Sequence, residues 1–321
     1  MTTPFSRLLL SETGRQVCGA IGLTASFAAF LGSSLPHTYL LYKYKEIVQF
    51  YQDGLPIDLD PEVANRANEV LQATTLLSTH KANIRFFPVA MLDTFFAGSA
   101  VASHGAEIGL PVTFGYKKTE DVKTSNLSIR NVPQPMWTTR EAQQLKDSLI
   151  LSERAQKFAI AREIYWCDRY YVHTHSLMLS LAVLNCYVMS YLLNERFQLL
   201  HRVPRKARVL MYGVVAAFNA TAYICLKDAT SQYWDRKADE SAAALGREYA
   251  EGGVEYYQKI LQKNRALREM MGKAGESTYT SKGNISRIFR TDHLPLTHRL
   301  DCLKNQARAW ADDAARKEAC A

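Results

Sequence analysis

The stretch KFAIAREIYW, residues 157–166, has the residue types and spacing that come nearest to a catalytic motif in this sequence. If histidine replaced Arg162 and Trp166, the stretch would read H-E-x-x-H, the helical motif with which zinc peptidases present two metal ligands and a general base. The carboxylate, Glu163, is present. Arginine keeps its proton and the indole nitrogen has no free lone pair, so neither side chain can bind a metal. We therefore expect no catalytic residue, no metal ligand and no cofactor here.

Two carboxylates later in the chain, Asp235 and Asp239, are four residues apart and stand where a zinc peptidase could carry its third ligand. We hypothesise that the guanidinium of Arg162 takes the place of the metal and pairs with Asp235 and Glu163, so that one cation substitutes for another. In the alternative, Arg162 extends to solvent and Asp235 caps a helix or pairs locally.

Two further residues are candidates for the same site. Helical spacing places Trp166 on the face that carries Arg162. His293, in the segment DHLPLTHR, is expected to fix a turn or to orient a partner rather than to catalyse. The sequence contains no glycine-rich phosphate loop and no nucleophile elbow, and its six cysteines form no CxxC pair. This pattern favours neither a disulfide scaffold nor a cysteine zinc site.

Three apolar runs, residues 17–35, 176–194 and 209–226, contain no charged residue. Each would form a helix roughly 28 Å long, which is close to the thickness of the hydrocarbon core of a bilayer. The alternatives are buried helices of a soluble bundle and, for the first run, a signal peptide. The connector between the second and third runs is basic and contains Pro204, as expected for a turn on the positive side of a membrane. We predict three spanning helices.

The charge pattern agrees with a membrane protein. The net charge of +8 arises mostly between residues 169 and 208, where six basic residues are accompanied by one acidic residue. An excess confined to so short a segment argues against nucleic-acid binding, which would require a broad basic face. No charge falls within the three runs, which makes a transporter the weakest of the functional classes.

The apolar runs divide the chain into seven parts. We expect an amino-terminal segment (1–16), transmembrane helix 1 (17–35), the first part of a polar domain (36–175), transmembrane helix 2 (176–194), a basic turn (195–208), transmembrane helix 3 (209–226) and the second part of the polar domain (227–321). The predicted fold class is a mainly α membrane protein with a small β-hairpin or sheet, three transmembrane helices and a zincin-like, pseudo-peptidase polar region.

Strand and helix signals fill the polar domain. The runs at residues 84–90 and 106–114 have β-type composition and predict a hairpin, with residues 98–105 as its turn. Asp60, followed by proline, predicts a helix cap and a helix that ends near residue 77.

Further helices are expected after these strands. Thr138 and Glu141 form a capping box, so a helix should begin near residue 139 and continue, with a joint near Ser152, into the second span. Gly252 and Gly253 are expected to separate two helices.

The order of these parts resembles that of the integral-membrane zinc peptidases of the heat-shock and prenyl-protein-processing kind. Between residues 84 and 304, strands, an H-E-x-x-H-like helix, a membrane hairpin, a D-x-x-x-D pair and a late H-x-P-x-x-x-R segment follow in that order. The order agrees, whereas the ligands do not.

A closer resemblance is to the transmembrane protein 177 family. The blocks LSERAQKFAIAREI (151–164), GGVEYYQKILQKNRALREMMGKAGESTYTSKGN (252–284) and HLPLTHRLD (293–301) are similar to its most recognisable segments. The resemblance implies a non-enzymatic role in the mitochondrial inner membrane, in the biogenesis of cytochrome c oxidase subunit 2 together with chaperones. It also implies an amino terminus and basic turn in the matrix, with the polar regions in the intermembrane space.

Two other observations bear on function. Asn185 and Asn219, within the spans, are polar enough to hydrogen-bond a partner helix, as an assembly factor would require. The alternative is a membrane-embedded hydrolase of unrecognised type related to the zinc peptidases, which would require a deep pocket with titratable residues.

Overall fold

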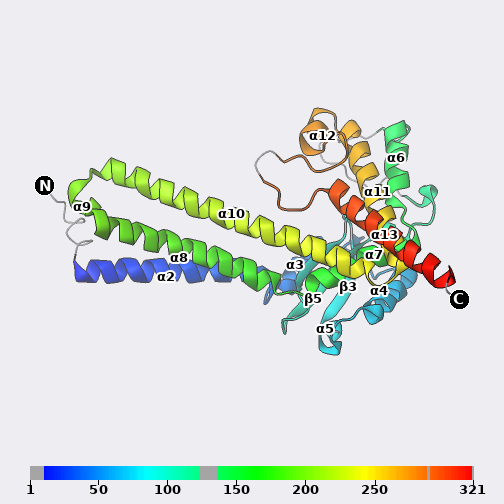
Figure 1. Cartoon of the computed structure of the whole chain (residues 1–321), viewed down its shortest axis with the longest axis horizontal. Coiled ribbons are helices and arrows are strands. Elements are labelled where there is room, and N and C mark those ends of the chain that lie inside the picture. The colour runs from blue at the N-terminus through cyan, green and yellow to red at the C-terminus, as the bar shows by residue number, and fades with distance from the viewer. Residues whose placement is uncertain (1–10, 123–135, 288–289, 320–321) are drawn as a thin grey trace. The chain divides into compact units, whose positions relative to one another are not determined.

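The computed structural model describes residues 11–122, 136–287 and 290–319 of the 321-residue chain (Figure 1). It divides into two compact units. The first, which we call the three-helix unit, comprises Met1–Leu40 and Tyr170–Thr230. The second, the polar unit, comprises Leu41–Arg169 and Ser231–Ala321.

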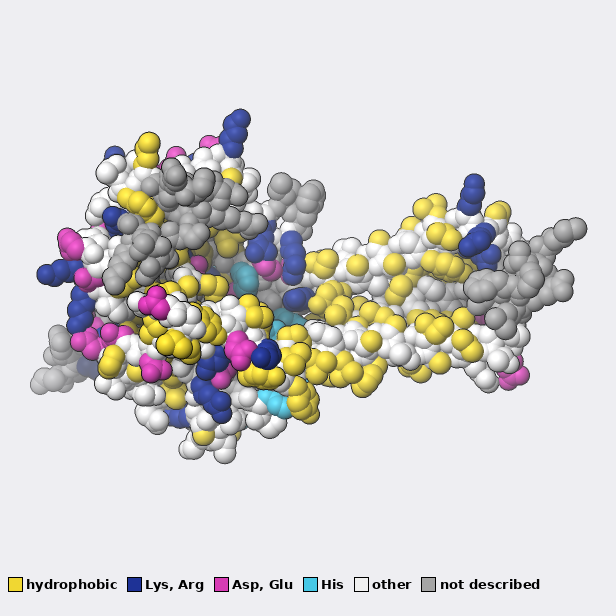
Figure 2. Space-filling model, turned by 180° about the vertical axis from the view of Figure 1, so that it is seen from behind, with side chains coloured by type: hydrophobic (Ala, Val, Ile, Leu, Met, Phe, Trp, Pro, Cys, Tyr) yellow, Lys and Arg dark blue, Asp and Glu magenta, His cyan; other side chains and the backbone are white. Residues whose placement is uncertain are grey.

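The three-helix unit contains α2 (Glu12–Ser34), α8 (Tyr171–Phe197) and the first part of α10 (Arg205–Ala243), with the short helices η1 (Leu35–His37) and α9 (Leu199–Arg202). By length and composition, all three long helices can cross a membrane, which confirms the predicted spans. Figure 2 shows hydrophobic side chains over much of the surface of this unit and Lys and Arg side chains near its end. An exposed apolar surface of this kind is expected where lipid is the solvent.

Small and polar residues hold these helices together. A Cβ atom on Gly22 of α2 would lie 2.7 Å from the ring of Tyr187 on α8, so glycine permits this close approach. The hydroxyl of Ser26 donates a hydrogen bond of 2.9 Å to the carbonyl of Ser180. Between α8 and α10, the amide of Asn185 donates to the side-chain oxygen of Asn219 at 2.7 Å. Such contacts are typical of helix association in membranes. The two asparagines therefore bind each other, whereas we expected them to serve a partner helix.

Asn219→Ala is expected to lower the free energy of unfolding by about 1 kcal/mol, because the amide of Asn185 loses its interhelical acceptor. The measurement is equilibrium unfolding of the full-length protein in mixed micelles. Asn185→Ala and the double variant complete a cycle that isolates the pairwise energy. A coupling energy of zero would show that the pair does not stabilise the unit.

The sheet of the polar unit has the strand order β3-β5-β4, with β3 (Ile84–Val89), β4 (Phe95–Ser99) and β5 (Gly105–Pro111). β4 is antiparallel to β5, whereas β3 is parallel to β5. The predicted hairpin between residues 84–90 and 106–114 is therefore wrong. The antiparallel partner of β5 is β4, whose FFAGS sequence overlaps the expected turn.

The central strand explains this topology. Every residue of β5 is buried, as expected for a strand covered on both faces. A Cβ atom on Gly109 would lie 2.4 Å from Val89 of β3, so a larger residue would separate the strands. Gly98 and Gly105 both have positive φ, at 78° and 77°, and they lie on either side of the β4–β5 turn. Glycine adopts this conformation without strain.

Short elements precede the sheet: α3 (Leu41–Val48), β1 (Tyr51–Gln52), β2 (Leu55–Pro56), α4 (Pro61–Ala73) and α5 (Ser78–Ala82). The predicted cap of α4 is confirmed, because the carboxylate of Asp60 accepts hydrogen bonds from the backbone N–H groups of Glu62 and Val63. The helix ends at Ala73, four residues before the expected end. The 3-10 helices η2 (Val112–Gly115) and η3 (Thr119–Asp121) follow the sheet.

Two helices follow in the polar unit, α6 (Arg140–Leu149) and α7 (Glu153–Cys167). The residue that caps α6 is Thr139 and not Thr138, since its hydroxyl accepts from the N–H of Ala142. The joint near Ser152 is confirmed, because Ser152 caps α7 through the N–H of Ala155. The chain leaves the helix after Cys167, before α8, and we did not predict this break.

The remaining helices are α11 (Arg247–Met270), α12 (Lys273–Thr278) and α13 (Leu296–Ala319). Gly252 and Gly253 lie inside α11, so the predicted break is wrong. A Cβ atom on Gly252 would lie 2.2 Å from the carbonyl oxygen of Arg154 on α7, and one on Gly253 would contact Phe158 and Leu303. The glycines let α7, α11 and α13 pack closely, and they do not interrupt the helix.

Candidate functional site

The candidate site is built around α7, which is buried on almost all sides. Its side chains Arg162 and Glu163 are 13% and 1% exposed, respectively, and Asp235 on α10 is fully buried. Burial of charged groups is costly unless each is paired and hydrogen-bonded. The contacts made by these three side chains therefore have to offset the cost of burying their charges.

The guanidinium of Arg162 lies among three carboxylates. Its Nη1 donates to Oε1 of Glu163 at 2.5 Å and its Nη2 to Oδ1 of Asp235 at 3.1 Å. Its Nε lies 3.4 Å from Oδ1 of Asp239. Oε1 of Glu163 also accepts a hydrogen bond of 2.6 Å from the hydroxyl of Thr94. The cation of Arg162 is thus held from three directions.

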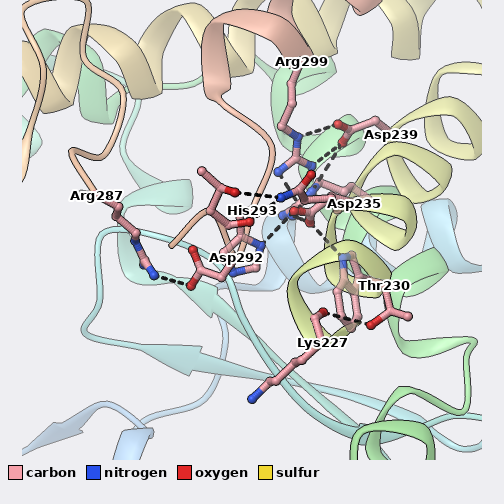
Figure 3. Close-up of polar contacts among 12 residues, drawn as sticks. Lys227, Thr230, Asp235, Asp239, Arg287, Asp292, His293 and Arg299 are labelled. Carbon is pink, nitrogen blue, oxygen red and sulfur yellow. Dashed lines mark hydrogen bonds and ion pairs between the residues drawn. The ribbon is translucent and has the colours of Figure 1, made fainter. Parts of the chain in front are cut away.

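A second guanidinium, that of Arg299 on α13, completes the neutralisation of Asp239 (Figure 3). It binds this carboxylate in a bidentate manner, with Nε donating to Oδ2 at 2.6 Å and Nη2 to Oδ1 at 2.8 Å. The hydroxyl of Tyr257 on α11 donates to the same Oδ1 at 2.8 Å. The guanidinium carbon lies 4.8 Å from the centre of the Tyr257 ring, which adds a cation–π contact.

Asp235 also contacts two ring nitrogens. Nε1 of Trp166 donates to Oδ1 at 3.0 Å, and Nδ1 of His293 lies 2.8 Å from Oδ2 (Figure 3). The side chain of His293 is half exposed, so it is the part of this network that solvent reaches. The structure therefore brings together all six residues that the sequence singled out: Arg162, Glu163, Trp166, Asp235, Asp239 and His293.

We use the name ion cluster for five charged side chains that are at most 13% exposed: Arg162, Glu163, Asp235, Asp239 and Arg299. Two guanidiniums and three carboxylates give it a formal charge of −1. Four of its five charges therefore cancel in pairs, and one negative charge remains.

The contacts within the ion cluster shift the pKa values of Asp235 and Arg162. Burial alone would raise the pKa of Asp235, which lies nine residues beyond the apolar segment 209–226, but Arg299, the hydrogen bond from His293 and Arg162 together lower it. Burial alone would lower the pKa of Arg162, but Glu163 and the other acidic groups around it raise it well above the usual value. Both shifts favour the charged forms at neutral pH.

Sequence reasoning gave no role to Arg299, Tyr257 or Thr94. A signal was present for Arg299, because it is the arginine of the H-x-P-x-x-x-R segment that begins at His293. Pro295 precedes the first turn of α13, and the N–H of Arg299 bonds to its carbonyl, so the spacing places this guanidinium in the first turn of the helix. Tyr257 and Thr94 had no comparable local signal, since only tertiary packing brings them to the carboxylates.

The residues of the ion cluster do not fit a zinc ion. The guanidinium of Arg162 occupies the space between the carboxylates, and neither Arg162 nor Trp166 has a lone pair to give. Over the residues that the structure describes, no group of three or more His, Cys, Asp or Glu side chains is placed to hold a metal ion. We therefore derive no metal-dependent step from this site.

A cleft of about 410 Å³ lies beside the ion cluster. Arg162, Arg299 and His293 form part of its lining, together with Tyr256, Tyr257 and Tyr279. Burial raises the pKa of Tyr256 to about 12, so its hydroxyl remains protonated at neutral pH. The guanidiniums of Arg162 and Arg299 are already bound to carboxylates, so the cleft offers mainly the aromatic surface of its tyrosines, which suits contact with a polypeptide segment.

Sequence similarity to known proteins covers most of the chain and not only the candidate site. The family described as transmembrane protein 177 matches residues 62–317 of the chain. The chain is 30% identical to transmembrane protein 177 of Danio rerio over 277 residues, which cover 84% of this chain and 87% of that protein. It is 30% identical to transmembrane protein 177 of Homo sapiens over 285 residues, 87% of this chain and 89% of the relative.

A third relative covers more of the chain. Transmembrane protein 177 of Xenopus laevis is 28% identical over 314 residues, which represent 95% of this chain and 98% of that protein. No solved structure matches the chain significantly. The family match over residues 62–317 includes the second and third spans and the positions of the ion cluster, whereas the first span lies before it.

Proposed function

Because the chain belongs to the transmembrane protein 177 family, we propose that it is a non-catalytic protein of the mitochondrial inner membrane that assists the biogenesis of cytochrome c oxidase subunit 2. Its partners in this proposal are that subunit and its inner-membrane chaperones, within one assembly. The amino terminus and the basic turn lie in the matrix, and the polar unit lies in the intermembrane space. The three apolar helices support the membrane part of this proposal.

The observation that carries the non-catalytic part is the position of Arg162. A hydrolase of the zinc type needs a metal with an open coordination position and a carboxylate free to take a proton from water. Here Arg162 stands at the motif position of a metal-binding histidine, and Oε1 of Glu163 accepts from both Arg162 and Thr94, while Oε2 is buried without a hydrogen bond to the described residues. The guanidinium of Arg162 cannot exchange ligands as a metal can, and it links α7 to α10 through Asp235. We therefore assign it a structural role, in keeping with a non-catalytic protein.

The proposed binding surface for the client polypeptide is the cleft beside the ion cluster. Its tyrosine rings offer aromatic surface to an extended segment, and the half-exposed imidazole of His293 offers a polar contact. The ion cluster forms one side of this surface and holds it in a single arrangement. In this interpretation the cluster acts by position and takes part in no bond-making step.

The experiment is affinity capture of the tagged full-length protein from mitochondria solubilised in digitonin. We expect recovery of cytochrome c oxidase subunit 2 with its chaperones, and none with an unrelated three-span inner-membrane protein as the control. Capture should be unchanged after chelator treatment. Stoichiometric zinc in the purified protein, together with chelator-sensitive peptide cleavage, would refute the proposal, as would capture that lacks subunit 2.

A further inference from the structure

The three-helix unit contains an open cavity of about 780 Å³ that is lined by α2, α8 and α10. Most of its lining is apolar, with residues such as Ile21, Ala182 and Ala220. On α10 the lining extends from Arg208 to Tyr223, which corresponds to about 22 Å along the helix. Half of a bilayer's hydrocarbon core is about 15 Å thick. The cavity is therefore long enough to hold an acyl chain that starts at the end where Arg208 lies.

The charges on the lining gather at that one end. Arg15 and Glu195 both line the cavity there and form an ion pair of 3.3 Å with each other. Arg208 lines the cavity as well, and its Nε is buried without a hydrogen bond to the described part of the chain. The lining thus carries one guanidinium in excess, and its buried Nε–H has no acceptor among the described residues.

The first turn of α10 also favours the binding of an anion at this end of the cavity. Arg205, Lys206 and Arg208 lie in this turn, which contains no acidic residue. Cations are unfavourable at a helix N-terminus, where the helix dipole is positive and the first N–H groups have no intrahelical acceptor. Around it, residues 11–16 and 195–208 carry six basic and two acidic residues, an excess of +4. An anion at Arg208 would relieve this repulsion.

We propose that this cavity binds one anionic phospholipid. The phosphate of its headgroup accepts hydrogen bonds from Arg208, and one acyl chain lies against the apolar lining between α2, α8 and α10. An occupant with one charged end and an apolar body matches the distribution of charge along the cavity. A spanning helix of a partner, about 30 Å long and 10 Å across, would fill roughly 2,400 Å³, far more than the cavity offers.

The proposal does not depend on the proposed function, because it concerns the spans alone. Its test is native mass spectrometry of the full-length protein, released from detergent and titrated with dioleoyl phosphatidylglycerol or with dioleoyl phosphatidylcholine. We expect a one-to-one adduct with phosphatidylglycerol, at an apparent Kd at least fivefold lower than with phosphatidylcholine, since the two lipids have the same chains and differ in charge.

Three variants locate the site. Arg208→Gln should weaken phosphatidylglycerol binding about fivefold, whereas the matched control Arg205→Gln, which removes a cation from the same turn but does not line the cavity, should change it less than twofold. Ala220→Phe, which fills the apolar part of the cavity, should weaken the binding of both lipids. Inorganic phosphate should not compete at millimolar concentration.

Four results would overturn the proposal. They are equal binding of the two lipids by the wild-type protein, equal effects of Arg208→Gln and Arg205→Gln, full competition by inorganic phosphate, and a polypeptide retained in place of the lipid. The comparison of the two lipids needs only the wild-type protein, so the test remains decisive even where a variant fails to fold.

Discussion

Arg162→Met is expected to lower the free energy of unfolding of the polar unit by about 3–5 kcal/mol, because it leaves buried carboxylates without their shared cation. In the variant, Arg299 alone would face Glu163, Asp235 and Asp239, and the formal charge of the ion cluster would change from −1 to −2. Methionine fills a similar volume, so the loss reports charge more than packing. The measurement is thermal unfolding of the full-length protein in detergent, followed by tryptophan fluorescence.

Two comparisons isolate the cause. Arg236→Met removes an exposed guanidinium from α10 that pairs with Glu240, and it should change stability little. The double variant Arg162→Met/Asp235→Asn returns the formal charge to −1, and it should be less destabilised than the sum of the two single variants. Additive effects would show that Arg162 and Asp235 do not act as a pair.

The same variant has a distinct pH dependence. Asp235 has a lowered pKa in the folded protein, so its contribution to stability is complete above its unfolded pKa of about 3.9 and is lost as the pH falls through the folded value. Arg162→Met removes one of the groups that lower this pKa. The difference in stability between the wild type and Arg162→Met should therefore be largest at neutral pH and shrink below about pH 4.

The fold could be predicted from the sequence wherever the signal was local. The three spans are charge-free runs of 18 or 19 residues, and the cap at Asp60 depends on its own neighbours. The arrangement of the sheet could not be predicted in the same way, because β3 pairs in parallel with β5 and each residue of the pairing lies 22 positions from its partner, as in Ile84 with Ala106 and Val89 with Pro111. The FFAGS strand is short and ends in turn-type residues, so composition alone suggested a turn.

Part of the candidate site could be predicted from the sequence, namely the pairing of Arg162 with Asp235. The similarity of residues 162–166 to a metal-binding motif placed Arg162 opposite Asp235, and the structure has their guanidinium and carboxylate 3.1 Å apart. Arg299 was given no role although it belongs to the H-x-P-x-x-x-R segment, because that motif alone does not say which carboxylate the arginine meets. Its role depends on Asp239, a residue 60 positions earlier in the sequence. The resemblance to the transmembrane protein 177 family is confirmed by a match over residues 62–317.

Gly252→Ala is expected to lower the free energy of unfolding by about 3 kcal/mol, the upper part of the usual range for overpacking. The added methyl would lie 2.2 Å from the carbonyl oxygen of Arg154, and a backbone atom cannot rotate away as a side chain can. Relief requires α11 to move away from α7, the helix that carries Arg162 and Glu163. The variant should therefore also disturb the ion cluster.

Two other glycine variants serve as comparisons for the loss of stability in Gly252→Ala. Gly253→Ala places its methyl against the side chains of Phe158 and Leu303, which can shift, so its loss should be smaller than that of Gly252→Ala. Gly213→Ala, in α10, meets no atom within 4 Å and should not destabilise, because alanine favours the helix more than glycine does. Thermal unfolding and resistance to limited proteolysis measure all three. If Gly252→Ala were as stable as the wild type, its methyl group could not lie 2.2 Å from the carbonyl oxygen of Arg154. The close packing of α7 against α11 would then be refuted.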